Sequence, residues 1–267
     1  MKNIKGNTAL VTGGTSGIGW EFSQQLAAKG CNVLMVSIQK DLLDTLPAQL
    51  SAQYGVQSWG LYLDLVRDDA ADELWNWCRQ NNIEIDILVN NAGIFFVREL
   101  GPDSRDRAET MLKLHVMTPF RLVALFGQDM KQRHKGYIVN MSSLAAKMPI
   151  PGITNYSATK AFLMSFSKSM YYEMRLYGVG VTAVLPAAIA TTLYRLQSRQ
   201  MKFGVALGLI RTPQWLVRRS LRAMLHHRQV LRPTMMNFFL PLIIKMMPKL
   251  FITKLWKKYK DDPHFKF

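Results

Sequence analysis

The chain has 267 residues, of which 49% are hydrophobic and 19% charged, so it has enough apolar residues for a core and is not intrinsically disordered. The net charge of +16 is unevenly spread, because residues 191–267 hold 16 of the 34 Lys and Arg residues but only 2 of the 18 Asp and Glu residues. That segment carries +14 against +2 for residues 1–190, which argues against a nucleic-acid-binding protein coated in positive charge. Two cysteines, Cys31 and Cys78, are too few for a disulfide framework, and Met1–Asn7 does not resemble a signal peptide, so we expect a cytoplasmic protein.

The first two thirds of the chain alternate short β-branched runs with longer helical patterns, the first of them at Trp20–Lys29. Strands that alternate with helices require crossover connections, which produce a parallel sheet with helices on both faces. We therefore predict one domain over residues 1–267, an α/β fold with a Rossmann-type doubly wound parallel sheet of about seven strands. The predicted strands are Thr8–Thr12, Asn32–Ser37, Ser58–Leu63, Ile85–Asn90, Gly136–Met141, Val179–Leu185 and, at the end, Gln229–Leu231.

A glycine-rich segment, TGGTSGIG, runs from Thr12 to Gly19 between the first predicted strand and the first predicted helix. Gly13 permits a tight turn, while Gly17 and Gly19 let the backbone approach a pyrophosphate closely. The N-terminus of the following helix offers free N–H groups and the positive end of the helix dipole to phosphate. The GxxxGxG spacing differs from the GxGxxG of many dehydrogenases, and an ordinary glycine-rich turn is the alternative. No Lys-Ser or Lys-Thr pair follows, which argues against a nucleotide triphosphatase.

Tyr156 and Lys160 stand four residues apart in YSATK, which places them one turn apart on one face of a helix. An ammonium group at that distance stabilises a phenolate, so Tyr156 is a candidate proton donor to a carbonyl oxygen. Ser143 follows the fifth predicted strand, where loops line the ligand crevice of a parallel sheet, and its hydroxyl is a candidate to orient the same oxygen. Ser142 is adjacent and is easily confused with it, and a surface Tyr–Lys pair is the alternative for the helix.

Six features of the chain occur together and in this order: TGGTSGIG, Asp64 after the third strand, NNAG, the MSS serine, YSATK and a proline after the sixth strand. In these features the chain resembles the short-chain dehydrogenase/reductase family over roughly residues 5–195. The C-terminus resembles, more loosely, the 17β-hydroxysteroid dehydrogenase and 3-oxoacyl-CoA reductase branch. The resemblance implies a nicotinamide dinucleotide cofactor, no metal, and Ser143, Tyr156 and Lys160 as the catalytic set. The cofactor contacts that it implies are Gly13, Thr15, Ser16, Gly17, Ile18, Gly19, Ser37, Ile38, Lys40, Asp64, Leu65, Asn90, Ala92, Gly93, Tyr156, Lys160, Pro186, Ile189 and Thr191.

The chain departs from the family pattern at two positions of the site. His115 stands where the family usually has an Asn that helps to hold a proton-relay water, so we include His115 as a catalytic candidate that holds the water or titrates itself. A polar residue packed behind the site is the alternative. The usual Pro-Gly after the sixth strand is Pro186-Ala187 here.

The end of the second predicted strand bears on the choice between NAD and NADP. NAD-binding members generally carry an acidic side chain there, bonded to the ribose 2′-hydroxyl. This chain has Ser37, followed by Ile38 in the place where NADP-preferring relatives often carry Arg, and Lys40 adds a positive charge. We expect NADP(H) to be preferred, with NAD(H) as the alternative.

The segment that follows the sixth strand covers the substrate in the family, which makes residues 188–225 the predicted lid. Its apolar side chains, together with Phe95 and Phe96, favour an apolar pocket. The expected reaction is NADPH-dependent reduction of a hydrophobic ketone or a lipid-like or steroid-like 3-oxoacyl substrate to the alcohol. The alternatives are NAD-dependent oxidation of a secondary alcohol and a non-catalytic cofactor-binding regulator.

Residues 234–267 form a basic amphipathic extension. Lysines and prolines interrupt its apolar run before the ~20 residues that a membrane span needs. The pattern suits peripheral contact with an anionic membrane, while docking on the domain or on a second subunit is the alternative. The family resemblance implies a homodimer or homotetramer, and we expect no nucleic-acid partner.

Overall fold

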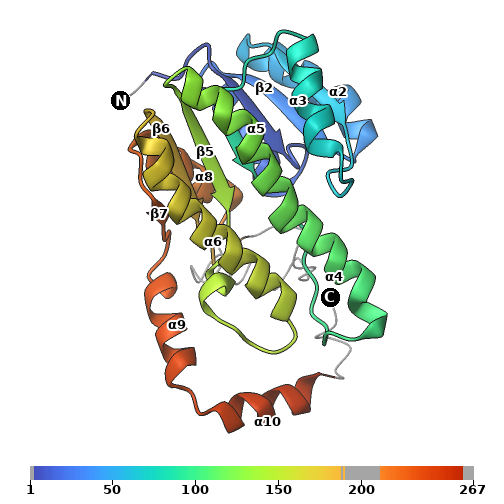
Figure 1. Ribbon diagram of the computed structural model, residues 1–267, viewed down its shortest axis with the longest axis vertical. Coiled ribbons are helices and arrows are strands. Elements are labelled where there is room, and N and C mark those ends of the chain that lie inside the picture. Colours follow the sequence, from blue (N-terminus) through green and yellow to red (C-terminus); the bar gives the residue numbers. More distant parts are fainter. Residues whose placement is uncertain (1–2, 188, 190–210, 261–267) are drawn as a thin grey trace.

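The computed structural model describes residues 3–187, 189 and 211–260, which form a seven-stranded parallel sheet flanked by helices (Figure 1). The strand order is β3-β2-β1-β4-β5-β6-β7, the doubly wound arrangement that the sequence predicts. The strands are β1 (Thr8–Thr12), β2 (Asn32–Ser37), β3 (Ser58–Tyr62), β4 (Ile87–Asn90), β5 (Gly136–Met141), β6 (Val179–Val184) and β7 (Val230–Leu231). Each predicted strand is present, with ends that differ by at most two residues.

Helices cover both faces of the sheet. Alternate residues of each central strand point to opposite sides, so each strand contributes apolar side chains to a core on either face. In β1, Ala9 and Val11 join the apolar core beneath α1 (Gly17–Ala27), α2 (Lys40–Tyr54) and α8 (Pro213–Leu225). Leu10 joins the core on the other face, beneath α3 (Ala70–Gln80), α5 (Thr118–Gln132) and α6 (Thr154–Arg175). Strands buried on both faces read as continuous apolar runs, which explains the pattern seen in the sequence.

Helix α8 lies within the segment predicted as the lid. Residues 213–225 pack into the core beside α1, where Leu216, Val217 and Leu221 are fully buried. Thr212 caps this helix by accepting a hydrogen bond from the N–H of Trp215 at 3.3 Å, and Pro213 occupies the first turn. Residues 213–225 therefore form part of the core. The lid over residues 188–225 stays a prediction, because most of its other residues, 188 and 190–210, lie outside the described residues.

The remaining helical segments lie toward the carboxyl ends of the strands (Figure 1). Here a short 3-10 turn η1 (Pro102–Ser104) leads into α4 (Arg105–Leu112), and the π-helical turn η2 (Lys113–Met117) joins α4 to α5. A second 3-10 turn, η3 (Leu144–Lys147), follows β5, and α9 (Met236–Met246) and α10 (Lys249–Tyr259) follow β7. Within the described ranges, no helix combines the length and the apolar character needed to cross a membrane.

Candidate active site

The glycine-rich segment forms the turn between β1 and α1 and brings two backbone segments into close contact. Gly13 has a φ of +62°, and a Cβ there would lie 3.2 Å from the Cα of Ala92. A Cβ on Gly19 would lie 1.9 Å from the carbonyl oxygen of Gly13, so only glycine lets α1 begin so near the turn. The Ser16 side chain forms no capping hydrogen bond and no acidic residue lies in the first turn, so the N-terminus of α1 suits an anionic group.

Side chains that were not among the predicted site residues hold the end of β4 against this turn. The hydroxyl of Thr12 accepts hydrogen bonds from the N–H groups of Asn91 and Ala92, at 2.9 and 3.0 Å. The side-chain amide of Asn91 donates to the carbonyl oxygen of Thr12 at 3.0 Å. The only sign of these roles in the sequence is that Thr12 and Asn91 lie inside the TGGTSGIG and NNAG motifs.

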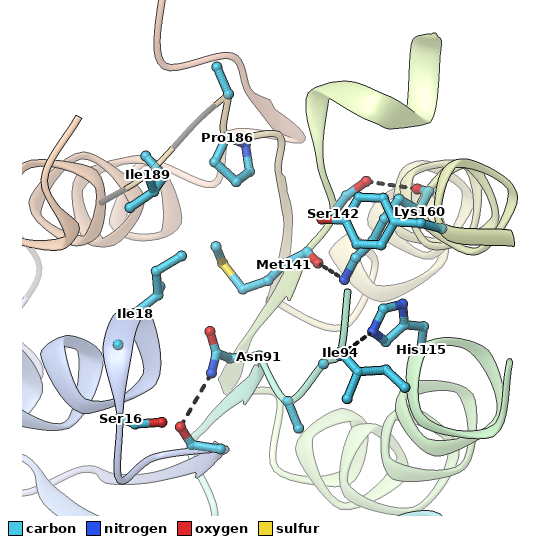
Figure 2. A pocket seen from close by; sticks show the side chains of 16 residues that line it. Ser16, Ile18, Asn91, Ile94, His115, Met141, Ser142, Lys160, Pro186 and Ile189 are labelled. Atoms are coloured by element: carbon cyan, nitrogen blue, oxygen red, sulfur yellow. Dashed lines mark hydrogen bonds between the residues drawn. The ribbon is translucent and has the colours of Figure 1, made fainter. Parts of the chain in front are cut away.

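Tyr156 and Lys160 lie near the start of α6, and both are almost fully buried (Figure 2 shows Lys160). The ammonium of Lys160 donates to the carbonyl oxygen of Met141 at 2.9 Å and lies 5.6 Å from the centroid of the Tyr156 ring. Burial lowers the pKa of Lys160 to about 8. Phe95 packs edge-on against Tyr156, with 4.8 Å between ring centroids. The helical spacing thus places the two residues together, as the sequence predicts.

The two adjacent serines have different surroundings. Ser142 donates its hydroxyl proton to the carbonyl oxygen of Lys160 at 2.7 Å, and this bond ties the end of β5 to α6. Ser143 caps η3, where its hydroxyl oxygen accepts from the N–H of Ala145 at 3.1 Å. That bond leaves the Ser143 proton available for donation, whereas the Ser142 proton is used. Ser142, however, lines the main cavity, so the catalytic assignment of Ser143 stays a prediction.

His115 lies in the π-helical turn η2, where it is fully buried. Its Nε2 accepts from the N–H of Ile94 at 3.0 Å, and its Nδ1 lies 3.1 Å from the hydroxyl of Thr159. Because the Thr159 hydroxyl donates to the carbonyl oxygen of Tyr156, it accepts from His115, so the ring carries its proton on Nδ1. Burial, and secondly the charge of Lys160, lower the pKa of His115 well below its usual value. The ring is therefore neutral, and both of its nitrogens are already engaged.

Behind these residues, buried amides join the strands to α6. Asn90 donates to the side-chain oxygen of Asn140 at 2.8 Å, and Asn140 donates to the hydroxyl of Ser167 at 2.9 Å. The side-chain oxygen of Asn90 has no hydrogen-bond partner among the described residues. Asn90 also lines a cavity of about 10 Å³ together with His115 and Lys160, which is room for about one water molecule.

These elements enclose a cavity of about 300 Å³ at the carboxyl ends of the strands (Figure 2). Most of the predicted cofactor contacts from the glycine turn, the NNAG segment and the end of β6 line it, together with His115, Tyr156 and Lys160. The lining residues are Gly13, Ser16, Gly17, Ile18, Asn91, Ala92, Gly93, Ile94, His115, Met141, Ser142, Tyr156, Lys160, Pro186, Ala187 and Ile189. The structure does not describe Thr191.

A second group of predicted contacts lies where β2 ends, outside the lining of this cavity. The hydroxyls of Thr15 and Ser37 are 2.8 Å apart, and Thr15 donates to the side-chain oxygen of Gln39 at 2.7 Å. Lys40 and the large apolar Ile38 are exposed beside them. Gln39, a polar neighbour of Thr15, is not among the predicted cofactor contacts. Asp64 and Leu65 follow β3, and Asp64 accepts from the N–H of Val66 at 3.0 Å.

The doubly wound sheet, with its glycine turn against a helix N-terminus and a Tyr–Lys pair in one cavity, is an arrangement typical of dinucleotide-binding proteins. The family model described as short chain dehydrogenase matches residues 7–202. A very-long-chain 3-oxoacyl-CoA reductase from Mus musculus is 32% identical over 197 residues, which cover 72% of this chain and 62% of that protein.

Two solved structures extend the comparison. A bulky-bulky ketone specific alcohol dehydrogenase from Comamonas testosteroni superposes with a TM-score of 0.75 at 27% identity, covering 91% of this chain and 95% of the other. A short-chain dehydrogenase from Sphingobium yanoikuyae in complex with NADPH gives a TM-score of 0.74 at 27% identity, covering 91% and 97%. The chain belongs to the short-chain dehydrogenase/reductase family.

Proposed function

We propose that this protein is an NADPH-dependent reductase of hydrophobic ketones or 3-oxoacyl groups. One observation carries the proposal: the glycine turn, Tyr156 and Lys160 line a single cavity at the carboxyl end of the sheet. A dinucleotide fits here with its pyrophosphate at the glycine turn. The turn has glycines at which a Cβ would clash, the N-terminus of α1 is uncapped, and the ammonium of Lys160 is buried.

Each catalytic side chain has a separate task in the proposed reaction. A bound nicotinamide supplies a hydride to the carbonyl carbon. Tyr156 donates a proton to the carbonyl oxygen, and Ser143 donates a hydrogen bond that orients this oxygen. Lys160, with a pKa of about 8, is mostly protonated at neutral pH, so its cation stabilises the Tyr156 phenolate and is placed to bind the nicotinamide ribose.

His115 acts in this proposal as a positioning residue and not as a holder of the relay water. Its Nε2 fixes the N–H of Ile94, and its Nδ1–H fixes the hydroxyl of Thr159 on α6. A Cβ on Gly93 would lie 2.8 Å from the Nε2, so the ring packs directly against the NNAG segment. The neutral imidazole therefore holds the end of β4 at a fixed distance from the helix that carries Tyr156.

The apolar surroundings of Tyr156 support a hydrophobic substrate. Phe95 contacts the Tyr156 ring, and Phe96 belongs to the same apolar cluster. Lys160 is the only charged side chain that lines the cavity among the described residues, so no arginine is there to bind a substrate carboxylate. The names of the mouse and Comamonas relatives, with their 3-oxoacyl-CoA and bulky ketone substrates, agree with this class of substrate.

The end of β2 supports NADPH over NADH. Ser37 occupies the position at which a carboxylate would repel a 2′-phosphate, and the hydroxyl of Thr15 lies 2.8 Å from it. Lys40 begins α2 and adds an exposed cation next to this group. We further propose that the protein is a cytoplasmic homodimer or homotetramer with peripheral membrane contact.

The test is turnover of NADPH and NADH with a panel of apolar ketones and 3-oxoacyl thioesters, for the wild type and for Tyr156→Phe. We expect turnover with NADPH, and a loss of about 10²–10⁴-fold in kcat in the variant because the proton donor is gone. Cofactor binding, followed by fluorescence, should persist. Tyr172→Phe removes a tyrosine hydroxyl from an exposed position of the same helix, α6, and should leave turnover unchanged.

Other outcomes contradict the proposal in different ways. Turnover that requires NADH, or that runs only in the direction of alcohol oxidation, supports the NAD-dependent dehydrogenase instead. Binding of both cofactors without turnover of any substrate in the panel supports a cofactor-binding regulator.

A further inference from the structure

Residues 234–260, here named the C-terminal arm, expose an unusual share of apolar surface. Of the nineteen large apolar side chains that are exposed in the described part of the chain, nine lie in the arm. On α9 they recur at helical spacing and form one stripe, while Asn237 on the opposite side is buried. The exposed residues are Met235, Phe238, Phe239, Leu242, Ile243, Met246, Leu250, Phe251 and Leu255.

The arm is also basic throughout. It contains six lysines and no Asp or Glu, and the sequence has no acidic residue from position 174 to position 260. On α10, Lys254 and Lys257 are exposed, and helical spacing places them in line with Leu250. The exposed apolar groups and the cations therefore share one face of α10.

Both ends of the arm are anchored to the domain. The amide of Asn237 donates to the carbonyl oxygen of Leu185, the residue after β6, at 2.6 Å. At the other end, the indole N–H of Trp256 donates to a carboxylate oxygen of Glu99 at 2.7 Å. The Trp256 ring packs so closely on Gly152 that a Cβ there would lie 2.5 Å from it. The arm lies below the carboxyl ends of the strands (Figure 1). Asn237 and Trp256 face the domain in these contacts, and the side chains of the apolar stripe stay exposed.

We propose that the C-terminal arm binds flat to the surface of a membrane that contains anionic phospholipid. Aromatic and aliphatic side chains that enter the interface, with lysines at the headgroups, are the two contributions that such binding needs. Symmetric pairing of two arms would place lysines against lysines with no carboxylate on either arm to neutralise them. The arm lies at the same end of the sheet as the active-site cavity, so this binding turns that end toward the bilayer (Figure 1).

The proposal rests on the peripheral membrane contact proposed above and deepens it by naming the surface of the chain and the class of lipid. Its test does not depend on turnover, so it can fail while the reductase activity stands. The full chain is mixed with vesicles of phosphatidylcholine alone, or of phosphatidylcholine with phosphatidylserine, and the bound fraction is measured by flotation. We expect binding to the anionic vesicles that weakens with added salt. Lys254→Glu/Lys257→Glu should weaken it by about tenfold or more, because each cation near an anionic surface contributes to affinity. Lys29→Glu/Arg218→Glu makes the same change in charge at exposed positions outside the arm and should bind as the wild type does.

A second measurement tests the orientation. Because Cys31 and Cys78 are buried, a fluorophore can be attached selectively at Phe239→Cys or, as control, at Lys29→Cys. Brominated lipid should quench the label at position 239 and not the label at position 29. Equal binding to neutral and anionic vesicles, equal loss in both charge-reversal variants, or no quenching at position 239 overturns the proposal. A dimer that dissociates in Phe239→Ser, without lipid binding by the wild type, overturns it in favour of an interface between copies of the chain.

Discussion

Ser37 and Lys40 are the residues on which the proposed preference for NADPH depends. In the proposed binding mode, Ser37→Asp places a carboxylate next to the 2′-phosphate of NADPH. We expect the ratio of kcat/KM for NADPH to that for NADH to fall by about a hundredfold, since like charges in contact cost about 3 kcal/mol. Steady-state kinetics with both cofactors measures this ratio.

Lys40→Glu tests the same site at an exposed position, where folding is not at risk, and should shift the ratio in the same direction. Thr45→Asp adds a negative charge to an exposed position further along α2 and serves as the control. An unchanged ratio in both Ser37→Asp and Lys40→Glu would mean that the end of β2 does not contact the 2′ position.

His115 gives the protein a pH-dependent stability of known sign. Its pKa is held well below its usual value of 6.5 in the folded state, so below pH 6.5 the unfolded chain binds more protons than the folded one. The free energy of unfolding should therefore fall as the pH falls below 6.5, by up to about 1.4 kcal/mol per pH unit. Urea unfolding at several pH values measures the slope.

His115→Asn should remove this part of the slope, because Asn does not titrate. His134→Asn changes an exposed histidine with a φ of +53°, a conformation that Asn accepts, and should keep the wild-type slope. Equal slopes in the wild type and in His115→Asn would show that the buried ring does not resist protonation.

The contacts of His115 show what the sequence leaves open at the residue scale. Helical spacing is enough to pair Tyr156 with Lys160, because that geometry is local. The partners of His115 lie 21 and 44 residues away in the chain, so their identity depends on how β4, η2 and α6 pack. The same holds for Ser142, whose hydroxyl is engaged by a carbonyl on α6 that no local pattern reveals.

At the scale of elements, the packing of α1 on the glycine turn depends on Gly19. Gly19→Ala would bring a methyl group onto the carbonyl oxygen of Gly13. This oxygen belongs to the backbone, so it cannot move aside by a change of side-chain rotamer. We expect a loss of about 1–3 kcal/mol in stability from overpacking and a marked loss of cofactor affinity, because α1 must move away from the turn.

Thermal unfolding and cofactor-binding fluorescence measure the two effects of Gly19→Ala. Gly101→Ala is the matched control, since nothing lies within 4 Å of its added Cβ and it should behave as the wild type does. If Gly19→Ala binds the cofactor normally, the close approach of helix and turn is not what forms the phosphate site.

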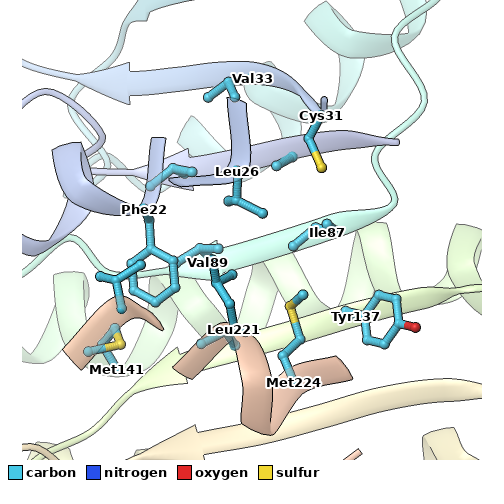
Figure 3. Close-up of a cluster of buried hydrophobic side chains, with 14 of the residues drawn as sticks. Phe22, Leu26, Cys31, Val33, Ile87, Val89, Tyr137, Met141, Leu221 and Met224 are labelled. Carbon is cyan, nitrogen blue, oxygen red and sulfur yellow. The ribbon is translucent and has the colours of Figure 1, made fainter. Parts of the chain in front are cut away.

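The place of helix α8 in the fold could not be predicted from its apolar pattern. Its apolar side chains suit a lid as well as a core, because both need an amphipathic helix. In the structure, Leu221 and Met224 pack against β-strand residues such as Val89 and beside Phe22 of α1 (Figure 3). The strands, in contrast, are predictable to within two residues, since fully buried parallel strands leave a continuous apolar run in the sequence.

At the scale of the whole molecule, an exposed aromatic cluster on α5 and α6 supports the proposed oligomer. Phe162 stacks on Phe166 with 5.6 Å between ring centroids, and Phe120 lies 6.2 Å from Phe166. Phe120 and Phe162 are 46% and 37% exposed, so neither is buried by its own domain. A second copy of this face would remove these rings from water, which is the main driving force for association.

We expect the wild type to elute as a dimer or tetramer in size-exclusion chromatography with light scattering, and Phe120→Lys/Phe162→Lys to elute as a smaller species. Each lysine would bring a positive charge into an apolar contact, where it has no partner and is costly to bury. Tyr62→Lys, at an exposed position of the edge strand β3, makes the same kind of change outside the cluster and should leave the mass unchanged. A wild-type protein that is monomeric at all accessible concentrations would show that this aromatic face does not join subunits.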